Sequence, residues 1–297
     1  MQSKRLLKDR LASRFMFFLT IFSGLVVFLI AFGLYQRSRS VLAVKPLTEL
    51  LFSTSWHPLK GEFGLFPFIM GTLWVTGVAV AIAIPFALLS AIYLSEYAHK
   101  KIRGWATTLI DLLAGIPSVI YGIWGVLVIV PLIKDHIAPF CRTFSTGYSI
   151  LAAGIVLAIM IFPVIIHVSI EVFRSIPDEL RDASLAIGAT KWQTIKCVVV
   201  RKAMPGIIAA IVLGLSRAFG ETMAVLMVAG NVARVPSSVL DPAYPLPALI
   251  ANNYGEMLSV PLYDSVLLLA AFVLLLVVLF FNIISRVILV RVERSIQ

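Results

Sequence analysis

The chain has 297 residues, of which 60% are hydrophobic and only 13% are charged, and its formal net charge is +10. A soluble domain of this size does not need so much apolar sequence, so the composition indicates a membrane protein. The Lys and Arg residues are scattered and lack interleaved aromatic residues on a polar face, which gives no reason to expect a nucleic-acid partner.

Six apolar stretches are each long enough to cross the hydrocarbon core of a bilayer, which takes about 20 residues of helix. We therefore expect an all-α polytopic membrane protein with six transmembrane helices, roughly at 15–35, 69–94, 106–133, 148–171, 204–229 and 264–290. Glycine and proline in the third stretch and Pro163 in the fourth predict kinks. No internal repeat is evident, so we expect residues 1–297 to form a single membrane domain.

The basic residues predict a topology. Residues 15–35 follow a basic leader but are long for a signal peptide and lack a small-residue cleavage site, so we expect a retained helix. With six spans both termini share a side, and that side carries 17 of the 25 Lys and Arg residues, against 7 on the other. The positive-inside rule then places both termini in the cytoplasm. Cys141 and Cys197 fall on opposite sides and cannot pair within one chain.

The third stretch contains the run AGIPSVIYGIWG, residues 114–125, which has two interpretations. In one, its glycines and Pro117 only bend and pack a membrane helix. In the other, backbone groups freed near Pro117 line a substrate path, with Ser118 and Tyr121 as additional donors. Two threonines of the second stretch are weaker candidates for the path, namely Thr72 and Thr76.

Residues 177–206 form a polar, basic segment between the fourth and fifth stretches. Asp178 and the glutamate after it suit a helix N-terminus, and Gly188 suits the turn after a helix C-terminus. Thr190 and Gln193 have the spacing of a capping box, so a second helix should begin there. A helical hairpin on a membrane face is typical of a coupling element for a soluble partner, although a solvated hairpin without a partner has the same pattern.

The fifth stretch carries an arginine and a glutamate in GLSRAFGETMAV, residues 214–225. Arg217 lies about 20 Å along the helix, near the bilayer centre, where an arginine is costly. Glu221 follows four residues later, one turn away on the same face of a helix. Both fall within the arc of small residues that recur every fourth position from Gly206 to Ala218, and such stripes mark close helix packing. We therefore expect the pair to face protein or a water-filled interior.

Two interpretations of this pair remain open. It is either a structural ion pair that ties helices together, or a substrate contact. In the second case Arg217 meets an anion on its route, and Glu221 holds or neutralises Arg217 between passages. A guanidinium offers a planar fork of donors that suits phosphate oxygens.

Five residues of the polar segment have a recognisable spacing: Asp182, Ala183, Ser184, Gly188 and Val198. This spacing resembles the EAA loop of ABC-importer permeases, and it implies that residues 178–200 couple the membrane domain to an ATPase. The segment departs from that pattern twice. Asp182 replaces the usual glutamate, and Val200 and Arg201 replace the closing Leu-Pro.

Two further motifs sharpen the resemblance. The run RAFGETMAV, residues 217–225, is similar to RALGETMAV of the PstC-type permeases of phosphate ABC importers, and AGIPSVIYGIWG resembles AGIPSVVYGLWG of the same family. Together with the loop from Trp56 to Thr72, the resemblance covers about residues 55–231.

This resemblance implies a permease subunit of an ATP-driven importer of inorganic phosphate in the bacterial cytoplasmic (inner) membrane. The partners implied are a second, PstA-type permease, two ATP-binding subunits on the cytoplasmic side and an external phosphate-binding protein. Residues near 55–68 and 234–262 are the expected external docking surface. The sequence has no Walker A loop, catalytic triad or metal-ligand spacing, so we expect no ATPase site, cofactor or metal of its own.

Three alternatives remain open from the residues. A permease for another oxyanion, such as molybdate or sulfate, needs the same architecture. An ion-coupled secondary carrier would use the Glu221 carboxyl and no ATPase. A membrane sensor or scaffold would transport nothing.

Overall fold

The computed structural model describes residues 2–256 and 259–296, with side chains over 11–256 and 259–291. Within this part of the chain, six helices are long and apolar enough to cross a membrane, which confirms the predicted number. They cover Leu11–Leu42, Phe66–Tyr97, Ser118–Phe140, Ile150–Arg174, Lys191–Gly220 and Tyr263–Arg291.

The secondary structure is almost entirely helical. The helices are α1 (Gln2–Leu42), α2 (Leu47–Phe52), α3 (Phe66–Ile92), α4 (Lys100–Gly115), α5 (Ser118–Trp124), α6 (Val130–Leu132), α7 (Ala138–Phe140), α8 (Ile150–Arg174), α9 (Asp178–Ala186), α10 (Lys191–Thr194), α11 (Val200–Gly220), α12 (Met223–Val228), α13 (Leu246–Asn253) and α14 (Tyr263–Ile296). Wider π-helical turns extend or join several of them, at Tyr93–Tyr97, Gly125–Ile129, Ile133–Ile137 and Ile195–Val199. Two short antiparallel strands, β1 (Trp56–His57) and β2 (Glu62–Phe63), pair with Trp56 opposite Phe63.

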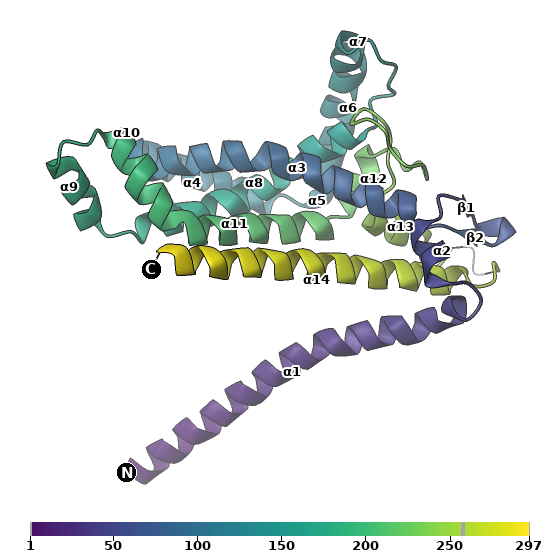
Figure 1. Cartoon of the computed structure of the whole chain (residues 1–297), viewed down its shortest axis with the longest axis horizontal. Helices are drawn as coiled ribbons and strands as arrows, with labels where there is room; N and C mark the ends of the chain where they lie inside the picture. Colours follow the sequence, from purple (N-terminus) through teal and green to yellow (C-terminus); the bar gives the residue numbers. More distant parts are fainter. Residues whose placement is uncertain (1, 257–258, 297) are drawn as a thin grey trace.

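The long helices α3, α8, α11 and α14 lie alongside one another (Figure 1). We call the end that carries α9 and α10 the hairpin end, and the opposite end, with α2, β1, β2 and α13, the platform end. Both termini lie toward the hairpin end, as six spans require (Figure 1). Helix α1 contacts α14 near Tyr35, whose ring lies 6.1 Å from that of Phe272, and its first part diverges from the bundle (Figure 1).

The third span differs from its predicted bounds of 106–133. Residues 100–115 form the separate helix α4, and the chain is extended at Ile116, with φ −69° and ψ 128°. The reason is Pro117, because the residue before a proline is pushed out of the helical region. The apolar helix therefore begins at Ser118 and reaches Phe140.

The fifth span is also not the continuous helix predicted over 204–229. Helix α11 ends at Gly220, and the chain is extended at Glu221 before α12 begins at Met223. The residues on both sides of the break are apolar, so the hydropathy pattern alone does not reveal it. The predicted span is therefore two helices joined at a break.

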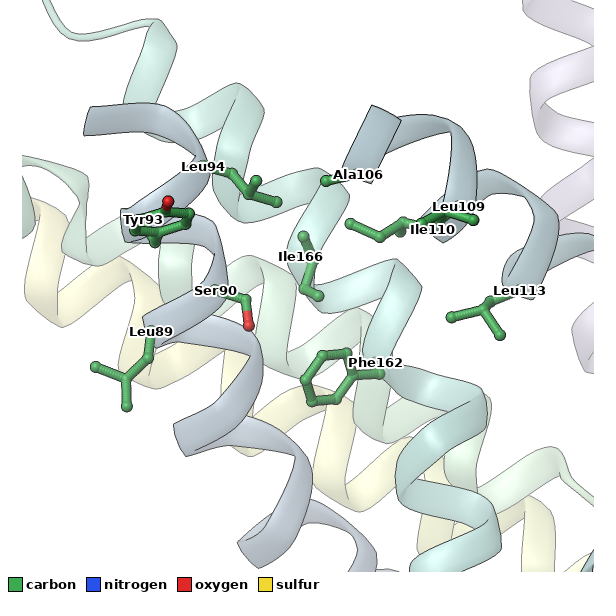
Figure 2. Close-up of a pocket in the computed structure, with 10 residues that line it drawn as sticks. All are labelled: Leu89, Ser90, Tyr93, Leu94, Ala106, Leu109, Ile110, Leu113, Phe162 and Ile166. Atoms are coloured by element: carbon green, nitrogen blue, oxygen red, sulfur yellow. The ribbon is translucent and has the colours of Figure 1, made fainter. Parts of the chain in front are cut away.

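An open apolar groove of about 550 Å³ lies on the surface toward the hairpin end. The last part of α3 and its π-helical turn form one wall, and α4 forms the other. Phe162 and Ile166 of α8 form the floor (Figure 2). The groove lies apart from the break between α11 and α12.

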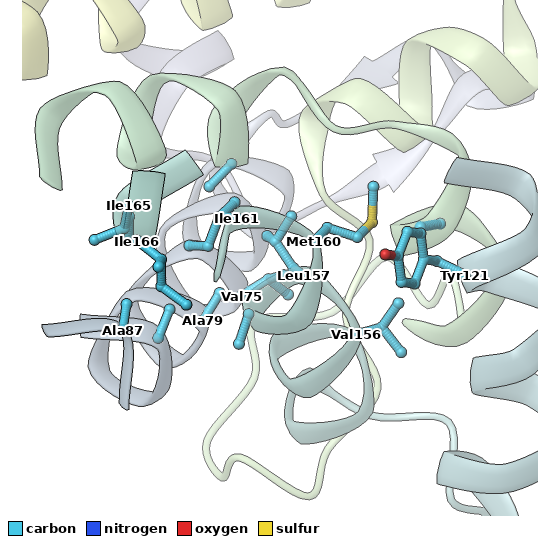
Figure 3. Packing of buried hydrophobic residues seen from close by; sticks show 14 of the residues in the cluster. Val75, Ala79, Ala87, Tyr121, Val156, Leu157, Met160, Ile161, Ile165 and Ile166 are labelled. Carbon is cyan, nitrogen blue, oxygen red and sulfur yellow. The ribbon is translucent and has the colours of Figure 1, made fainter. Parts of the chain in front are cut away.

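The core is built around α8, which runs between α3 and α11. Its side chains, including Leu157, Ile161 and Ile165, meet small residues of α3 such as Ala79 and Ala87 (Figure 3). Glycines allow this close approach, because a Cβ added at Gly154 would lie 2.5 Å from Cγ1 of Val78. The fold thus depends on backbone proximity between α3 and α8.

We expect Gly154→Val to destabilise the bundle by about 1–3 kcal/mol, because the added methyl groups overpack the contact with Val78. The measurement is the unfolding midpoint of the detergent-solubilised protein. Gly77→Val is the matched control, since a Cβ there meets no atom within 4 Å. Equal midpoints for the two variants would show that α3 and α8 do not pack this closely.

Candidate functional site

The break between α11 and α12 places non-helical backbone among apolar helices. Glu221 has φ −74° and ψ 127°, and Thr222 has φ −117° and ψ −56°. The Thr222 hydroxyl donates to the carbonyl oxygen of Gly220 over 3.3 Å, which satisfies one group freed by the break. At membrane depth such backbone is tolerated only where protein buries it or a water-filled cavity meets it. The break is therefore a candidate site.

Arg217 occupies the last turn of α11, and its side chain is exposed, whereas Ala218 beside it is 3% exposed. The small residues do pack on α8 as predicted, because a Cβ at Gly214 would lie 2.7 Å from Cγ1 of Ile165. The expectation that Arg217 shares their face is wrong. A stripe with a four-residue repeat drifts by about 40° per repeat around a helix, so at this level it has rotated to Ala218, about 100° from Arg217.

Glu221 turns the other way, into the protein. Its Oε1 accepts a hydrogen bond from the backbone N–H of Ala224 over 3.2 Å. The residue also lines a small cavity of about 10 Å³, near the size of one water, together with Thr72 and Thr76. Among the described side chains, Arg217 and Glu221 form no ion pair. The predicted one-turn spacing fails because the helix ends between them.

The break between α4 and α5 is bridged by Tyr121. The Tyr121 side chain is 7% exposed, and its hydroxyl donates to the carbonyl oxygen of Leu113 over 2.8 Å, so its proton is already engaged. The guanidinium of Arg217 is within electrostatic reach of Tyr121. Ser118 is the first residue of α5 and is half-buried. Tyr121 is therefore a structural bridge between α5 and α4 rather than a free donor.

Gly122 of α5 and Gly125 directly after it serve packing, in line with the first interpretation of the run 114–125. A Cβ at Gly122 would lie 2.5 Å from Sδ of Met227 in α12, and one at Gly125 would lie 2.7 Å from Cγ2 of Val156 in α8. These close contacts hold α5 against α12 and bring the two breaks together. Thr72 is also structural, because its hydroxyl donates to the carbonyl oxygen of Phe68 and accepts from the N–H of Leu246.

The polar segment forms the predicted helical hairpin at the hairpin end. Helix α9 begins at Asp178, and Gly188 has φ +88°, the left-handed conformation expected of the turn residue. Thr190 and Gln193 form the predicted capping box, and α10 continues through a π-helical turn into α11. The Ser184 and Thr194 hydroxyls lie 2.9 Å apart and are buried, so they join the two arms of the hairpin. Asp182 and Ala183 are exposed.

Arg181 fixes this hairpin to the bundle. Its Nη2 lies 2.9 Å from Oε1 of Glu96, which follows α3, and the two side chains are 17% and 9% exposed. Its guanidinium also donates to the carbonyl oxygens of Phe173 and Ile176 at the end of α8. The hydrogen bonds with Glu96 raise the pKa of Arg181 above its ordinary value. One side chain therefore joins α9 to the ends of both α3 and α8.

The platform end brings together the two segments predicted as a docking surface. The Phe68 ring, at the end of the first segment, lies 5.3 Å from that of Tyr244 in the second, and the Trp56 ring lies 4.8 Å from that of Phe68. Glu62 accepts hydrogen bonds from Ser55 and His57, and these two contacts, in that order, lower its pKa. Residues 257 and 258 of the second segment lie outside the described residues.

Sequence reasoning missed the polar contacts between distant segments, among them two that hold the hairpin and α11 in place. The Arg181–Glu96 pair joins residues 85 positions apart, and its only local signal is an arginine directly before the EAA-like motif. Between α11 and α14, the Ser216 hydroxyl donates to Oδ1 of Asn282 over 2.7 Å. An asparagine within the apolar sixth stretch was the available signal for that contact.

A family model described as "Binding-protein-dependent transport system inner membrane component" matches residues 83–297. The chain belongs to this family. Its six helices are accordingly those of a multi-pass inner membrane protein. Membership also confirms the permease architecture expected from the EAA-like hairpin.

Relatives of this permease are similar over most of its length. "Phosphate transport system permease protein PstC" of Xylella fastidiosa (strain 9a5c) is 37% identical over 279 residues, which covers 89% of this chain and 85% of that protein. "Probable ABC transporter permease protein YqgH" of Bacillus subtilis (strain 168) is 40% identical over 235 residues, which covers 78% of this chain and 74% of that protein. "Probable phosphate transport system permease protein PstC" of Methanocaldococcus jannaschii is 32% identical over 300 residues, which covers 96% of this chain and 95% of that protein.

Solved structures support the fold. A chain of the inward-facing MetNI methionine ABC transporter has a TM-score of 0.60 at 19% identity, covering 77% of this permease and 95% of that chain. A bacterial alginate ABC transporter in complex with its alginate-bound periplasmic protein has a TM-score of 0.57 at 15% identity, covering 89% and 92%.

We expect Arg181→Met to destabilise the permease by about 3–5 kcal/mol, because Glu96 is then buried without its counter-charge. The double variant Arg181→Met with Glu96→Gln should be destabilised by less than the sum of the destabilisations of the two single variants. The unfolding midpoint in detergent measures each variant. Asp178→Asn is the control, since that partner of Arg181 is 90% exposed and its loss should cost less than about 1 kcal/mol. Additive effects of Arg181→Met and Glu96→Gln would contradict a coupled pair.

Proposed function

We propose that this permease is the membrane-spanning subunit of an ATP-driven importer of inorganic phosphate. The observation that carries the proposal is Arg217, an exposed guanidinium beside a helix break in a chain whose relatives are described as phosphate transport permeases. A planar fork of donors can bind two oxygens of a phosphate at once. The relatives that are phosphate transport permeases favour phosphate over molybdate or sulfate, and family membership disfavours a secondary carrier or a scaffold.

The substrate path lies on the exposed face that carries Arg217. A second, PstA-type permease covers this face and completes a path between the two subunits. Arg217 then contacts the anion, with Ser118 nearby at the start of α5. Glu221 does not neutralise Arg217 between passages, because its carboxylate faces the inner cavity. Its role is to hold the first turn of α12 and thereby the shape of the break.

The hairpin of residues 178–200 couples transport to ATP hydrolysis. Large apolar side chains are exposed on it, including Leu185, Ile187 and Trp192, the last two at 86% and 52%. Exposed apolar residues on a polar hairpin mark a protein-binding surface. Asp182 and Ala183 lie on the exposed part of the same hairpin, so two separate ATP-binding subunits dock at this end. Arg181 transmits their movement to α3 and α8.

The other partners follow from this orientation. The hairpin end and both termini lie in the cytoplasm, and the platform end faces outward, where an external phosphate-binding protein docks on the segments around Trp56 and Tyr244. We expect the ATPase activity to reside in the partner subunits and the permease to need no cofactor or metal of its own. Membrane lipid surrounds the remaining surface.

Uptake of radiolabelled phosphate tests this function. Cells that lack their own phosphate permease and express this chain with its neighbouring transporter genes should take up phosphate in an ATP-dependent manner. Excess unlabelled phosphate should compete, whereas molybdate and sulfate should not. Competition by molybdate or sulfate at equal concentration would reassign the cargo, and uptake without ATP would reassign the class.

We expect Arg217→Gln to reduce phosphate uptake by about 10- to 150-fold, the value of a charged hydrogen bond. Arg217→Lys should also transport poorly, because an ammonium lacks the planar fork. Assembly of the complex should be unchanged, and Arg142→Gln, an exposed arginine outside the proposed docking segments, is the control. The double variant Arg217→Gln with Glu221→Gln should show no recovery. Near-normal uptake by an assembled double variant would instead identify a structural pair.

We expect Gly188→Val to insert normally but to lose ATP-driven uptake and association with the ATPase. A β-branched residue resists the left-handed conformation at φ +88°, which costs about 1–2 kcal/mol or more and distorts the hairpin. Co-purification of the ATPase measures the effect. Gly104→Val on α4 is the control, because its φ is not left-handed and a Cβ there meets no atom within 4 Å. Full uptake by Gly188→Val would contradict the role of the turn.

Thiol labelling tests the orientation. Cys141 and Cys197 are both free and exposed, and they lie toward opposite ends of the bundle. In intact cells a membrane-impermeant maleimide should label Cys141 wherever partner subunits leave it accessible, and Cys197 only after permeabilisation. Single-cysteine variants separate the two signals. Labelling of Cys197 in sealed cells would reverse the assignment of sides.

A further inference from the structure

The apolar groove toward the hairpin end is not part of the path or of the coupling hairpin. Its walls carry Leu89 and Tyr93 on one side and Leu109 and Leu113 on the other (Figure 2). It has a volume of about 550 Å³ and is open along its length. From Ala106 to Leu113, seven helical rises apart, it extends about 10 Å. Such a surface suits a hydrocarbon chain and does not suit a phosphate ion.

A fixed positive charge lies next to this groove, bonded to the backbone of Leu94, which lines it. Arg103 of α4 donates through Nε to the carbonyl oxygen of Leu94 over 2.7 Å, and through Nη2 to that of Ser95 over 2.7 Å. These neutral carbonyls hold the guanidinium in place without neutralising it. Among the described side chains no carboxylate pairs with Arg103. Lys100 and Lys101, both exposed, precede it on the same helix.

We propose that this groove binds an anionic phospholipid of the inner leaflet. One acyl chain lies along the groove on Phe162 and Ile166, and the headgroup phosphate meets Arg103. Basic pockets between membrane helices on the cytoplasmic side have the charge that such headgroups require. The choice of leaflet rests on the orientation proposed above, whereas the choice of an anionic headgroup rests on the charge of Arg103.

The position of the groove gives this lipid a consequence for coupling. Leu94 lines the groove, and it belongs to the π-helical turn Tyr93–Tyr97 that also carries Glu96. Glu96 in turn holds Arg181 of the coupling hairpin. A lipid bound here stabilises the turn on which the hairpin is seated. The occupied groove therefore favours the hairpin geometry that the ATPase engages.

Native mass spectrometry of the assembled transporter tests the site. The complex is reconstituted with equal amounts of phosphatidylglycerol and phosphatidylcholine, and the lipids that it retains are counted. We expect preferential retention of phosphatidylglycerol, reduced about fivefold by Arg103→Gln, which removes one basic charge at the membrane surface. Ala106→Phe, which fills the groove, should reduce retention of the same lipid.

Two control variants and one crosslink complete the experiment. Leu112→Phe changes α4 outside the groove and Lys134→Gln removes a distant charge, so both should retain phosphatidylglycerol as the wild type does. Equal retention of the two lipids by the wild type, or no loss in either groove variant, would overturn the proposal. The crosslink uses Leu109→Cys in a chain whose Cys141 and Cys197 are replaced by serine. Crosslinking of this cysteine to the second permease would also overturn the proposal, because a partner helix would then fill the groove.

The lipid count does not depend on phosphate transport. A complex that retains phosphatidylglycerol but moves another anion would contradict the proposed cargo and leave the lipid site in place. A complex that transports phosphate but does not prefer phosphatidylglycerol would contradict the lipid site and leave the proposed cargo in place. Labelling of Cys197 from outside would move the site to the other leaflet without changing the headgroup result.

Discussion

Hydrocarbon supplies no hydrogen-bond partner for a peptide group, and this constraint decides where the chain can leave helical geometry. The permease breaks its helices at two places among the apolar spans, before Ser118 and after Gly220. Each break is closed by a nearby side chain, the hydroxyl of Tyr121 in one case and that of Thr222 in the other. Because α5 packs on α12, the two breaks are neighbours, and Arg217 lies in the last turn before the second one.

The hairpin end follows a second constraint, the cost of burying an unpaired charge. Arg181 is largely buried, and it is stable there because Glu96 and two backbone carbonyls satisfy its guanidinium. These contacts persist only while α3, α8 and α9 keep their relative positions. The need to keep Arg181 paired therefore links the hairpin rigidly to the bundle. The hairpin cannot shift alone, and a force on it reaches the two most extensively packed helices of the bundle.

Features with local signals could be predicted from the sequence. The six spans follow from apolar runs, and the hairpin follows from Gly188 and the capping box, which act within a few residues. The break at Glu221 was missed because apolar residues continue past it, and the supposed pairing with Arg217 assumed an unbroken helix. The contact between Arg181 and Glu96 spans 85 positions and depends on tertiary packing, which one sequence does not reveal.

The absence of a loop between the hairpin and the fifth span has a mechanical meaning. From Lys191 to Gly220 the chain is helical without interruption, with a wider turn at Ile195–Val199. Such a rod is about 45 Å long, so a rotation of about 10° about one end moves the other by about 8 Å. Arg217 sits near the far tip of this lever. A small rotation that the ATP-binding subunits impose at the hairpin end would therefore displace the other end of this helix by more than the diameter of a phosphate ion.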